Sequence, residues 1–263
     1  MSDTLTQVLA DLATEGDRLE ALVADLSQDG WRTATPAAGW DVATQVAHLA
    51  WTDEAALAAA TDTFAWDALV LAAMVDPEGF VDESAMSAGR VAPADLLARW
   101  RGARTALADA LRAHPAGEKM PWFGPPMSAT SMATARYMET WAHSLDVHVA
   151  LGAEPVVDDG IRNVAHLGVR TRGFAFSVHG LQPPTDEVGV ELTAPSGDLW
   201  SWGPEDATQS VRGSAYDFCR LVTQRVHQSD TDLVAQGREA TTWLGIAQCF
   251  AGPTGNGRGP SDG

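Results

Sequence analysis

Apolar residues recur every three or four positions in four stretches of the first half of the chain. These stretches cover residues 5–26, 41–60, 93–111 and 128–151. Such a repeat indicates amphipathic helices. Thr4 or Asp3 is the expected N-cap of the first helix, and Asp41 and Ser128 are favourable N-caps of the second and fourth. Gly152 is a favourable stop for the fourth. Four helices of this length predict a four-helix bundle.

The rest of the chain has a different pattern. Residues 61–91 contain a helical stretch at 66–75 and a stop at 76–79, which suits a lid or a crossover. Prolines exclude a helix from the loop 120–127. Beyond it we expect a helix at 159–178, strands at 188–192, 199–202 and 208–211, a helix at 213–225 and a last helix at 240–250.

These elements predict a mainly α fold in two domains. Residues 1–153 form the expected four-helix bundle and residues 154–252 a small α+β domain. The tail, residues 253–263, is rich in Gly and Pro and is expected to be disordered.

Charge and composition narrow the class of protein. The 263 residues include 35 acidic and 17 basic side chains, for a formal net charge of −18. Such a surface repels phosphate backbones and anionic membranes, so we expect no nucleic-acid or membrane partner. The two cysteines form no disulfide framework, and the N-terminus lacks a signal-peptide pattern. We therefore expect a cytoplasmic protein, with a homodimer as the default assembly.

Two helices of the predicted bundle carry residues that suit a metal. Glu139 and His143 lie four residues apart and therefore share one face of the fourth helix. His48 stands in an apolar stretch of the second helix, with Asp53 or Asp146 as possible acceptors for its other nitrogen. Two imidazoles and a carboxylate can hold a divalent metal with an open position. The alternatives are a solvated Glu–His pair and a core histidine.

Three segments resemble a known family. They are GWDVATQVAHLA at 39–50, WFGPPMS at 122–128 and METWAHSLDV at 138–147. These motifs resemble the DinB-like metalloproteins and, more closely, the mycothiol-dependent maleylpyruvate isomerase group. The resemblance implies a divalent metal, usually zinc, bound by His48, Glu139 and His143. It also implies a small α+β second domain and, for part of the group, chemistry with a low-molecular-weight thiol.

A metal with an open position stabilises a bound thiolate, the nucleophilic form of a thiol. The leading hypothesis is therefore a mycothiol-dependent transferase or isomerase acting on a small electrophilic substrate. A hydrolase with metal-activated water, a non-catalytic metal-stabilised protein that sequesters a ligand, and a carrier built on the second domain are the alternatives. Nickel, iron or cobalt would also suit the three ligands.

Other side chains are secondary candidates. Trp122 and Phe123 precede the fourth helix and either line the pocket mouth, binding substrate, or bury the end of the bundle. Arg220 and Arg225 are candidate catalytic cations from the second domain, with surface salt bridges as the default. Arg136, one turn before Glu139, either points towards the site as a cation for an anionic substrate or, as the favoured alternative, is solvated. Packing is the expected role of Cys219 and Cys249, so an external thiol is favoured over a protein one.

Overall fold

The chain divides into two compact units, Met1–Pro155 and Val156–Gly263. The structure, a computed structural model, describes residues 2–76, 79–252, 254–255 and 257–261. Part of the tail that was expected to be disordered, namely residues 253, 256 and 262–263, lies outside the described residues. The mainly helical fold with a small sheet in the C-terminal part confirms the predicted fold class.

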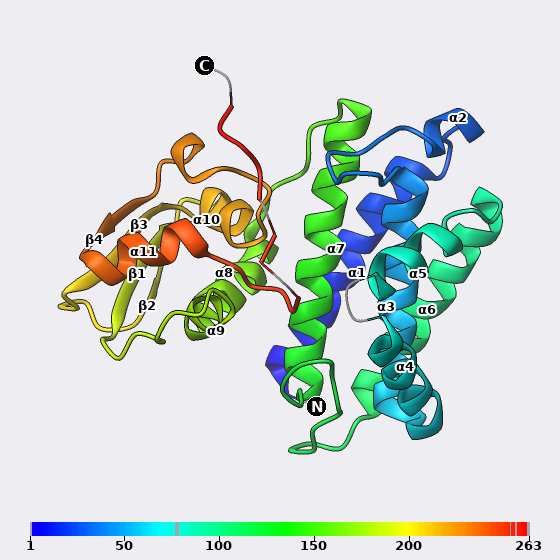
Figure 1. Cartoon of the computed structure of the whole chain (residues 1–263), viewed down its shortest axis with the longest axis horizontal. Helices are drawn as coiled ribbons and strands as arrows, with labels where there is room; N and C mark the ends of the chain where they lie inside the picture. The colour runs from blue at the N-terminus through cyan, green and yellow to red at the C-terminus, as the bar shows by residue number, and fades with distance from the viewer. Residues whose placement is uncertain (1, 77–78, 253, 256, 262–263) are drawn as a thin grey trace. The chain divides into compact units, whose positions relative to one another are not determined.

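The first unit is the predicted four-helix bundle (Figure 1). Its long helices are α1 (Asp3–Val23), α3 (Val42–Thr61), α6 (Pro93–Ala113) and α7 (Ala129–Leu151). Helix α3 packs against both α6 and α7, and α1 packs against α7. The connections carry the shorter helices α2 (Gln28–Trp31), α4 (Thr63–Val75) and α5 (Phe80–Ala88). The bundle therefore places the second and fourth predicted helices in direct contact.

Local capping explains where the long helices begin and end. The side chain of Asp41 accepts a hydrogen bond from the N–H of Thr44, and that of Ser128 accepts one from the N–H of Ser131. Gly152 ends α7 in the left-handed conformation, with φ of 62°. These three predictions are confirmed. The predicted cap of α1 was wrong, because Ser2 rather than Asp3 or Thr4 supplies the capping oxygen.

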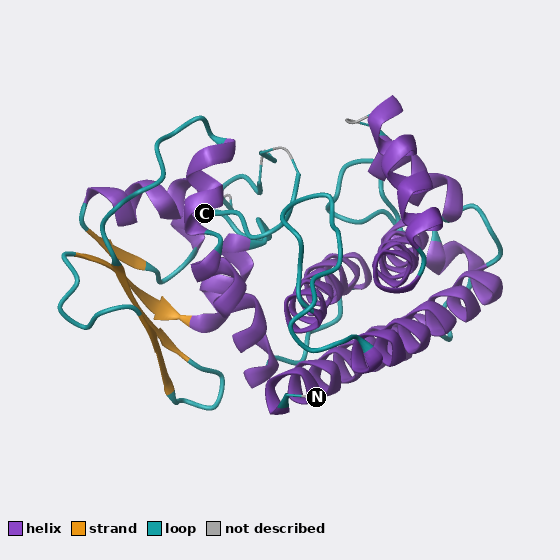
Figure 2. Cartoon of the chain, turned by 90° about the horizontal axis from the view of Figure 1, so that it is seen from below, coloured by secondary structure: helices purple, strands orange, loops and turns teal. Residues whose placement is uncertain are grey.

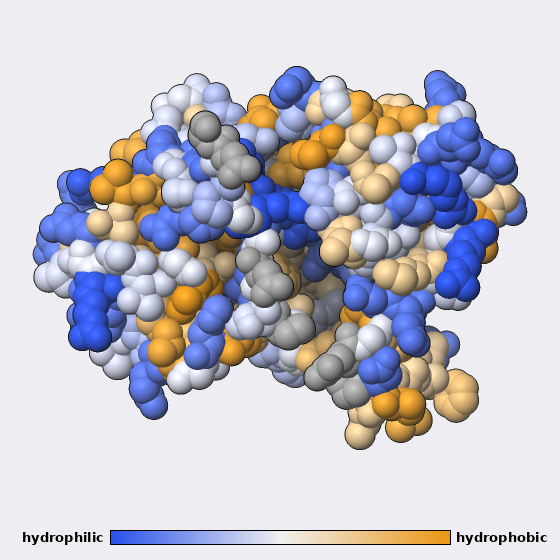
Figure 3. Space-filling model, turned by 45° about the horizontal axis from the view of Figure 1, so that its top comes forward, coloured by the Kyte–Doolittle hydropathy of each residue, from blue (hydrophilic) through white to orange (hydrophobic). Residues whose placement is uncertain are grey.

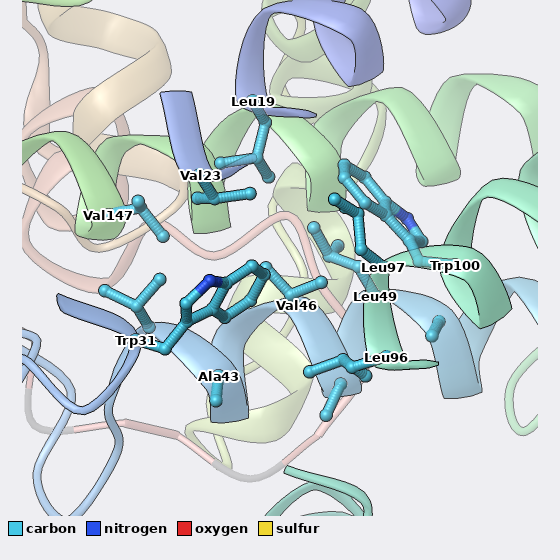
Figure 4. Close-up of a cluster of buried hydrophobic side chains, with 13 residues drawn as sticks. Leu19, Val23, Trp31, Ala43, Val46, Leu49, Leu96, Leu97, Trp100 and Val147 are labelled. Carbon is cyan, nitrogen blue, oxygen red and sulfur yellow. The ribbon is translucent and has the colours of Figure 1, made fainter. Parts of the chain in front are cut away.

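A large apolar cluster holds the bundle together around α3 (Figure 4). It combines Leu19 and Val23 of α1, Trp31 of α2, Leu96, Leu97 and Trp100 of α6, and Val147 of α7 with Val42, Ala43, Val46, Ala47, Leu49 and Ala50 of α3. Each large side chain buried here stabilises the fold by about 1.5–3 kcal/mol. The small alanines let neighbouring helices approach closely, so 13 of the 20 residues of α3 are buried. Polar residues of α3 are therefore held inside the bundle.

The connection between α3 and α6 contains two helices, of which only α4 was expected. Residues 77 and 78 of the predicted stop lie outside the described residues. Helix α4 buries Trp66 but exposes Phe64, Leu71, Met74 and Val75. Figure 3 shows apolar surface in orange at the lower right, over the end of the bundle that carries α4. Even so, none of the described helices combines the length and the apolar character needed to cross a membrane.

The second unit contains a four-stranded sheet, drawn in orange in Figure 2. Its strands are β1 (Val188–Thr193), β2 (Leu199–Trp202), β3 (Gln209–Ser214) and β4 (Val234–Gln236), in the order β2-β1-β3-β4. Strand β1 pairs antiparallel with β2 and parallel with β3, and β3 pairs antiparallel with β4. The first three strands were predicted and β4 was missed, because its three residues are too short to show alternation.

The second unit also contains helical segments. They are η1 (Asp159–Ile161), α8 (Arg162–Arg170), α9 (Arg172–Val178), α10 (Ala215–Val222), η2 (Gln228–Asp230) and α11 (Arg238–Ile246). The predicted helix at 159–178 is thus three pieces, with a break at Thr171. Helix α10 ends before the predicted Arg225, since Gln224 adopts a left-handed φ of 60° that no α-helix contains. Of these segments, α10 and α11 pack against the sheet.

Candidate metal centre

The structure brings His48, Glu139 and His143 together inside the bundle. Nε2 of His48 lies 3.5 Å from Oε2 of Glu139, and Nε2 of His143 lies 3.2 Å from the same oxygen. The two imidazole centroids are 4.5 Å apart. One ligand atom from each residue can be chosen so that all three lie within 4.8 Å of one another. Glu139 and His143 meet through helical spacing, whereas His48 arrives by the packing of α3 on α7.

Burial and hydrogen bonding set the charge of this group. Burial raises the pKa of the Glu139 carboxyl, but hydrogen bonds and positive charge from His143 and His48 lower it more, so the pKa lies well below its ordinary value. Glu139 is therefore a carboxylate at neutral pH. An ionised carboxylate beside two imidazoles is a donor set that a divalent cation prefers.

The distances fit such an ion. Ligand atoms about 2.0–2.2 Å from a tetrahedral metal lie about 3.3–3.6 Å from each other. The 3.2 and 3.5 Å separations from the two Nε2 atoms to Glu139 agree with that distance between ligand atoms.

The second ring nitrogen of His48, Nδ1, is buried without a hydrogen-bond partner among the described residues. Neither Asp53 nor Asp146 accepts from this nitrogen, so the predicted acceptors are wrong.

Aromatic rings enclose the imidazoles. The ring of Trp40 stacks on His143 at 5.8 Å and 16° and lies 5.3 Å from His48. The ring of Trp51 on α3 also lies near His48, with 6.2 Å between the ring centroids. Trp40 also donates from Nε1 to Asp82 of α5 at 3.2 Å. These rings restrict water around the site, which strengthens its electrostatic interactions.

The loop before α7 carries two aromatic residues, Trp122 and Phe123, that belong to a larger aromatic cluster including Trp51. Phe123 lies 6.5 Å from Trp51 and 4.8 Å from Trp66. Trp122 stacks on Trp66 at 5.7 Å and packs against the apolar cluster at the end of the bundle. Phe123 is 42% exposed, whereas Trp122 is half-buried. The two neighbours therefore occupy different surroundings, which the sequence alone did not distinguish.

Sequence reasoning was wrong about Arg136. Its side chain is buried, with Nε donating to Oδ1 of Asp53 at 2.9 Å and a terminal nitrogen donating to the hydroxyl of Thr52 at 2.6 Å. A solvated guanidinium would have been hydrogen-bonded by water and would have needed no partner in the protein. Instead the guanidinium joins α7 to α3 next to the candidate ligands His48 and Glu139.

Sequence reasoning also missed Gln45, whose Oε1 lies 2.5 Å from Nδ1 of His143. The available signal was a polar residue three positions before His48 in a largely apolar stretch. The structure shows that this residue is fully buried. Trp40 entered the sequence analysis only as part of the family motif at 39–50. Its contacts with two imidazoles depend on the loop that brings the chain into α3, and helical periodicity does not describe that loop.

The remaining predicted residues lie in the second unit. Arg220 is paired with Asp217 and stacks on Tyr216, with 4.7 Å from the guanidinium carbon to the ring centroid. Arg225 donates to the carbonyl of Thr223 at 2.6 Å. Both contacts stabilise the local fold. Cys219 is buried and its thiol contacts the carbonyl of Ile161 at 3.3 Å.

Comparison with known proteins identifies the relatives of this chain. A family model described as the mycothiol maleylpyruvate isomerase N-terminal domain matches residues 12–148. A second model, described as wyosine base formation, matches residues 184–236. Two uncharacterized proteins of Mycobacterium tuberculosis, from strains CDC 1551 and H37Rv, are each 55% identical over 250 residues, which is 95% of this chain and 97% of theirs.

Solved structures share the fold. A crystal structure of the mycothiol-dependent maleylpyruvate isomerase superposes with a TM-score of 0.59 at 17% identity, covering 89% of this chain and 95% of that one. A mutant of that enzyme gives a TM-score of 0.58 at 16% identity over the same shares. At such identities the likeness shows a common fold.

Proposed function

Because the chain belongs to the mycothiol maleylpyruvate isomerase N-terminal domain family, we propose that it is a metal-dependent enzyme that uses mycothiol to convert a small electrophilic substrate. His48, Glu139 and His143 are the proposed ligands, and zinc is the proposed metal. The observation that carries the proposal is the convergence of both Nε2 atoms on one oxygen of Glu139, at 3.5 and 3.2 Å.

A divalent metal held here supplies the positive charge that stabilises a bound thiol as its thiolate, which is the nucleophilic form. Three protein ligands leave a further position open. Glu139 contributes the negative charge of the ligand set, and the rings of Trp40 and Trp51 limit access of water. The proposed reaction is addition of the thiol to an electrophilic carbon of the substrate. If the adduct is the product, the reaction is a transfer. If the adduct rotates about the carbon–carbon bond and then eliminates the thiol, the reaction is an isomerisation.

The protein's own cysteines do not supply this thiol. Burial, with the nearby Cys249 thiol, raises the pKa of Cys219 well above its ordinary value. A buried thiol of raised pKa is a poor nucleophile. Cys249 is also buried. This favours an external thiol, in agreement with the family's name.

Phe123 is the proposed contact for an apolar part of the substrate or thiol. It is the exposed member of the aromatic cluster, and Trp51 joins it to His48. For Trp122, its packing on the end of the bundle supports the other alternative, burial of the bundle end.

Elemental analysis tests the metal part of the proposal. Wild-type protein is expected to contain about one zinc ion per chain, and His48→Ala and Glu139→Ala are expected to lose it. His148→Ala is the matched control, because His148 lies on α7 but hydrogen-bonds the carbonyl of Ser144 at 2.8 Å. A folded wild type without stoichiometric metal would refute the proposed centre.

The thiol part is tested on cobalt-substituted protein. Addition of mycothiol is expected to produce thiolate-to-cobalt charge-transfer absorption in the wild type. Stoichiometric metal without any spectral response to mycothiol would contradict thiol chemistry and would favour the non-catalytic protein or the hydrolase.

A further inference from the structure

A chain of three hydrogen bonds runs from the loop before α3 to the proposed ligand His143. Thr35 and Trp40 belong to that loop, and Gln45 belongs to the first turns of α3. Oγ1 of Thr35 donates to the carbonyl of Trp40 at 3.0 Å, and Nε2 of Gln45 donates to Oγ1 of Thr35 at 2.9 Å. The third contact, of 2.5 Å, joins Oε1 of Gln45 to Nδ1 of His143. Gln45 is fully buried.

The first member of this chain fixes the direction of every bond. A backbone carbonyl only accepts, so the single hydroxyl proton of Thr35 points to Trp40. Oγ1 of Thr35 therefore presents a lone pair to Gln45, which must donate from its amide nitrogen. This leaves the amide oxygen of Gln45 facing His143. Because that oxygen has no hydrogen, the proton in the contact belongs to Nδ1 of His143.

The reverse amide orientation of Gln45 is less favourable. It would place Oε1 opposite the hydroxyl of Thr35, which would then need two protons to satisfy both Trp40 and Gln45. One hydrogen bond of a fully buried side chain would be lost, and an unsatisfied buried polar group is costly. The network therefore selects one orientation of the amide.

We propose that Gln45 is a positioning residue which, anchored by Thr35, holds His143 as the tautomer with its proton on Nδ1 and directs the Nε2 lone pair at the metal. The inference rests on the proposed metal function of His143. It goes beyond the proposed ligands because Gln45 is not one of them and acts on the metal only through the imidazole ring of His143. The geometry agrees, since Nε2 is the nitrogen that lies 3.2 Å from Glu139.

The opposite tautomer would carry its proton on Nε2, and that nitrogen could not bind a metal. Free imidazole in water exchanges between the two forms, so loss of Gln45 leaves His143 to spend part of its time in the form that cannot bind. Polar partners behind metal-bound histidines contribute in this way to metal affinity, and their loss typically weakens it by about 10–100-fold.

Three variants test this hydrogen-bond chain through zinc affinity, measured by competition with a chromophoric chelator. Gln45→Leu removes the acceptor and Thr35→Val removes the anchor, and both are expected to weaken zinc binding, Gln45→Leu by about tenfold or more. Thr35→Ser keeps the hydroxyl and is expected to retain the affinity. Thr134→Val is the control, because the hydroxyl of Thr134 on α7 donates to the carbonyl of Thr130 at 2.9 Å.

A second measurement reads the Nδ1 proton of His143 directly in zinc-loaded protein, from long-range ¹H–¹⁵N correlations and from the exchange rate of that proton with water. Wild type is expected to show zinc on Nε2 and a hydrogen-bonded, slowly exchanging proton on Nδ1, and Gln45→Leu and Thr35→Val are expected to show faster exchange. A purely structural role of Gln45 would not change this signature. Zinc bound to Nδ1 in the wild type, or wild-type zinc affinity in Gln45→Leu, would overturn the proposal.

The two measurements separate this inference from the proposed function. If the wild type bound no zinc, the proposed function would fail. If the wild type bound zinc and Gln45→Leu bound it equally well, this inference alone would fail. If Gln45→Leu did not fold, Thr35→Val would decide it, because this substitution is nearly isosteric and lies in a partly buried loop.

Discussion

Arg136 of α7 and Asp53 of α3 form an ion pair closed off from solvent, with 2.9 Å between Nε and Oδ1. Asp53 follows His48 by five residues, and Arg136 precedes Glu139 by three. The pair therefore joins these two helices about one turn away from the proposed ligands His48 and Glu139. The contact of Gln45 with His143 joins the same helices a second time. Two polar links thus join α3 and α7 at the proposed centre.

We expect the Arg136 link to be necessary for stability. Burial raises the pKa of Asp53 even beside Arg136, so the carboxylate depends on its partner. Arg136→Met leaves that carboxylate buried and unpaired, which should lower the free energy of unfolding by about 3–5 kcal/mol. Urea denaturation measures this loss. Arg99→Met, which breaks the partly exposed pair with Glu54, is the control and should cost less than about 1 kcal/mol. Equal losses would contradict the expectation.

The two aromatic residues of the loop before α7 should behave differently. Trp122→Ala removes a side chain that packs on the end of the bundle, and should cost about 1–3 kcal/mol of unfolding free energy. Phe123→Ala removes an exposed ring and should cost less than about 1 kcal/mol. It should instead weaken mycothiol or substrate binding about fivefold. Cobalt-protein titration with mycothiol and urea denaturation separate these effects. The opposite assignment would place Trp122 at the site.

Acid should weaken the contact that holds Arg220. Burial raises the pKa of Asp217, but hydrogen bonds from Arg220 and from the N–H of Asp232 lower it more, so the pKa lies below its ordinary value of 3.8. A carboxyl with a lowered folded-state pKa stabilises the fold above about pH 4 and loses that contribution as pH falls through the folded value.

Asp217→Asn should therefore show a smaller loss of unfolding free energy than wild type when the pH falls from about 5 to about 2. Urea denaturation at constant ionic strength measures both slopes. Parallel pH profiles would show that Asp217 does not hold Arg220 by charge, and would return Arg220 to the group of candidate catalytic cations.

The predictions that succeeded from sequence rest on local rules. Asp41, Ser128 and Gly152 fix helix ends within one turn of chain. Glu139 and His143 share a face because helical spacing requires it, and His48 was proposed from its place in an apolar stretch of the second helix, which the family motif supported. The contacts of Trp40, Gln45 and Arg136 could not be read in this way. Each joins residues of different elements, so it depends on the relative register of α3, α7 and the loop 33–41, which periodicity does not determine.

The burial of 13 of the 20 residues of α3 has a consequence for how such a protein can diverge. Enlarging a side chain in a packed helix costs about 1–3 kcal/mol, so most substitutions along α3 would be removed by selection on folding. Helix α4 buries only Trp66 among its described residues, and can change at little cost to stability. New substrate preferences should therefore arise in α4 and the loop around Phe123, while the ligand framework stays the same.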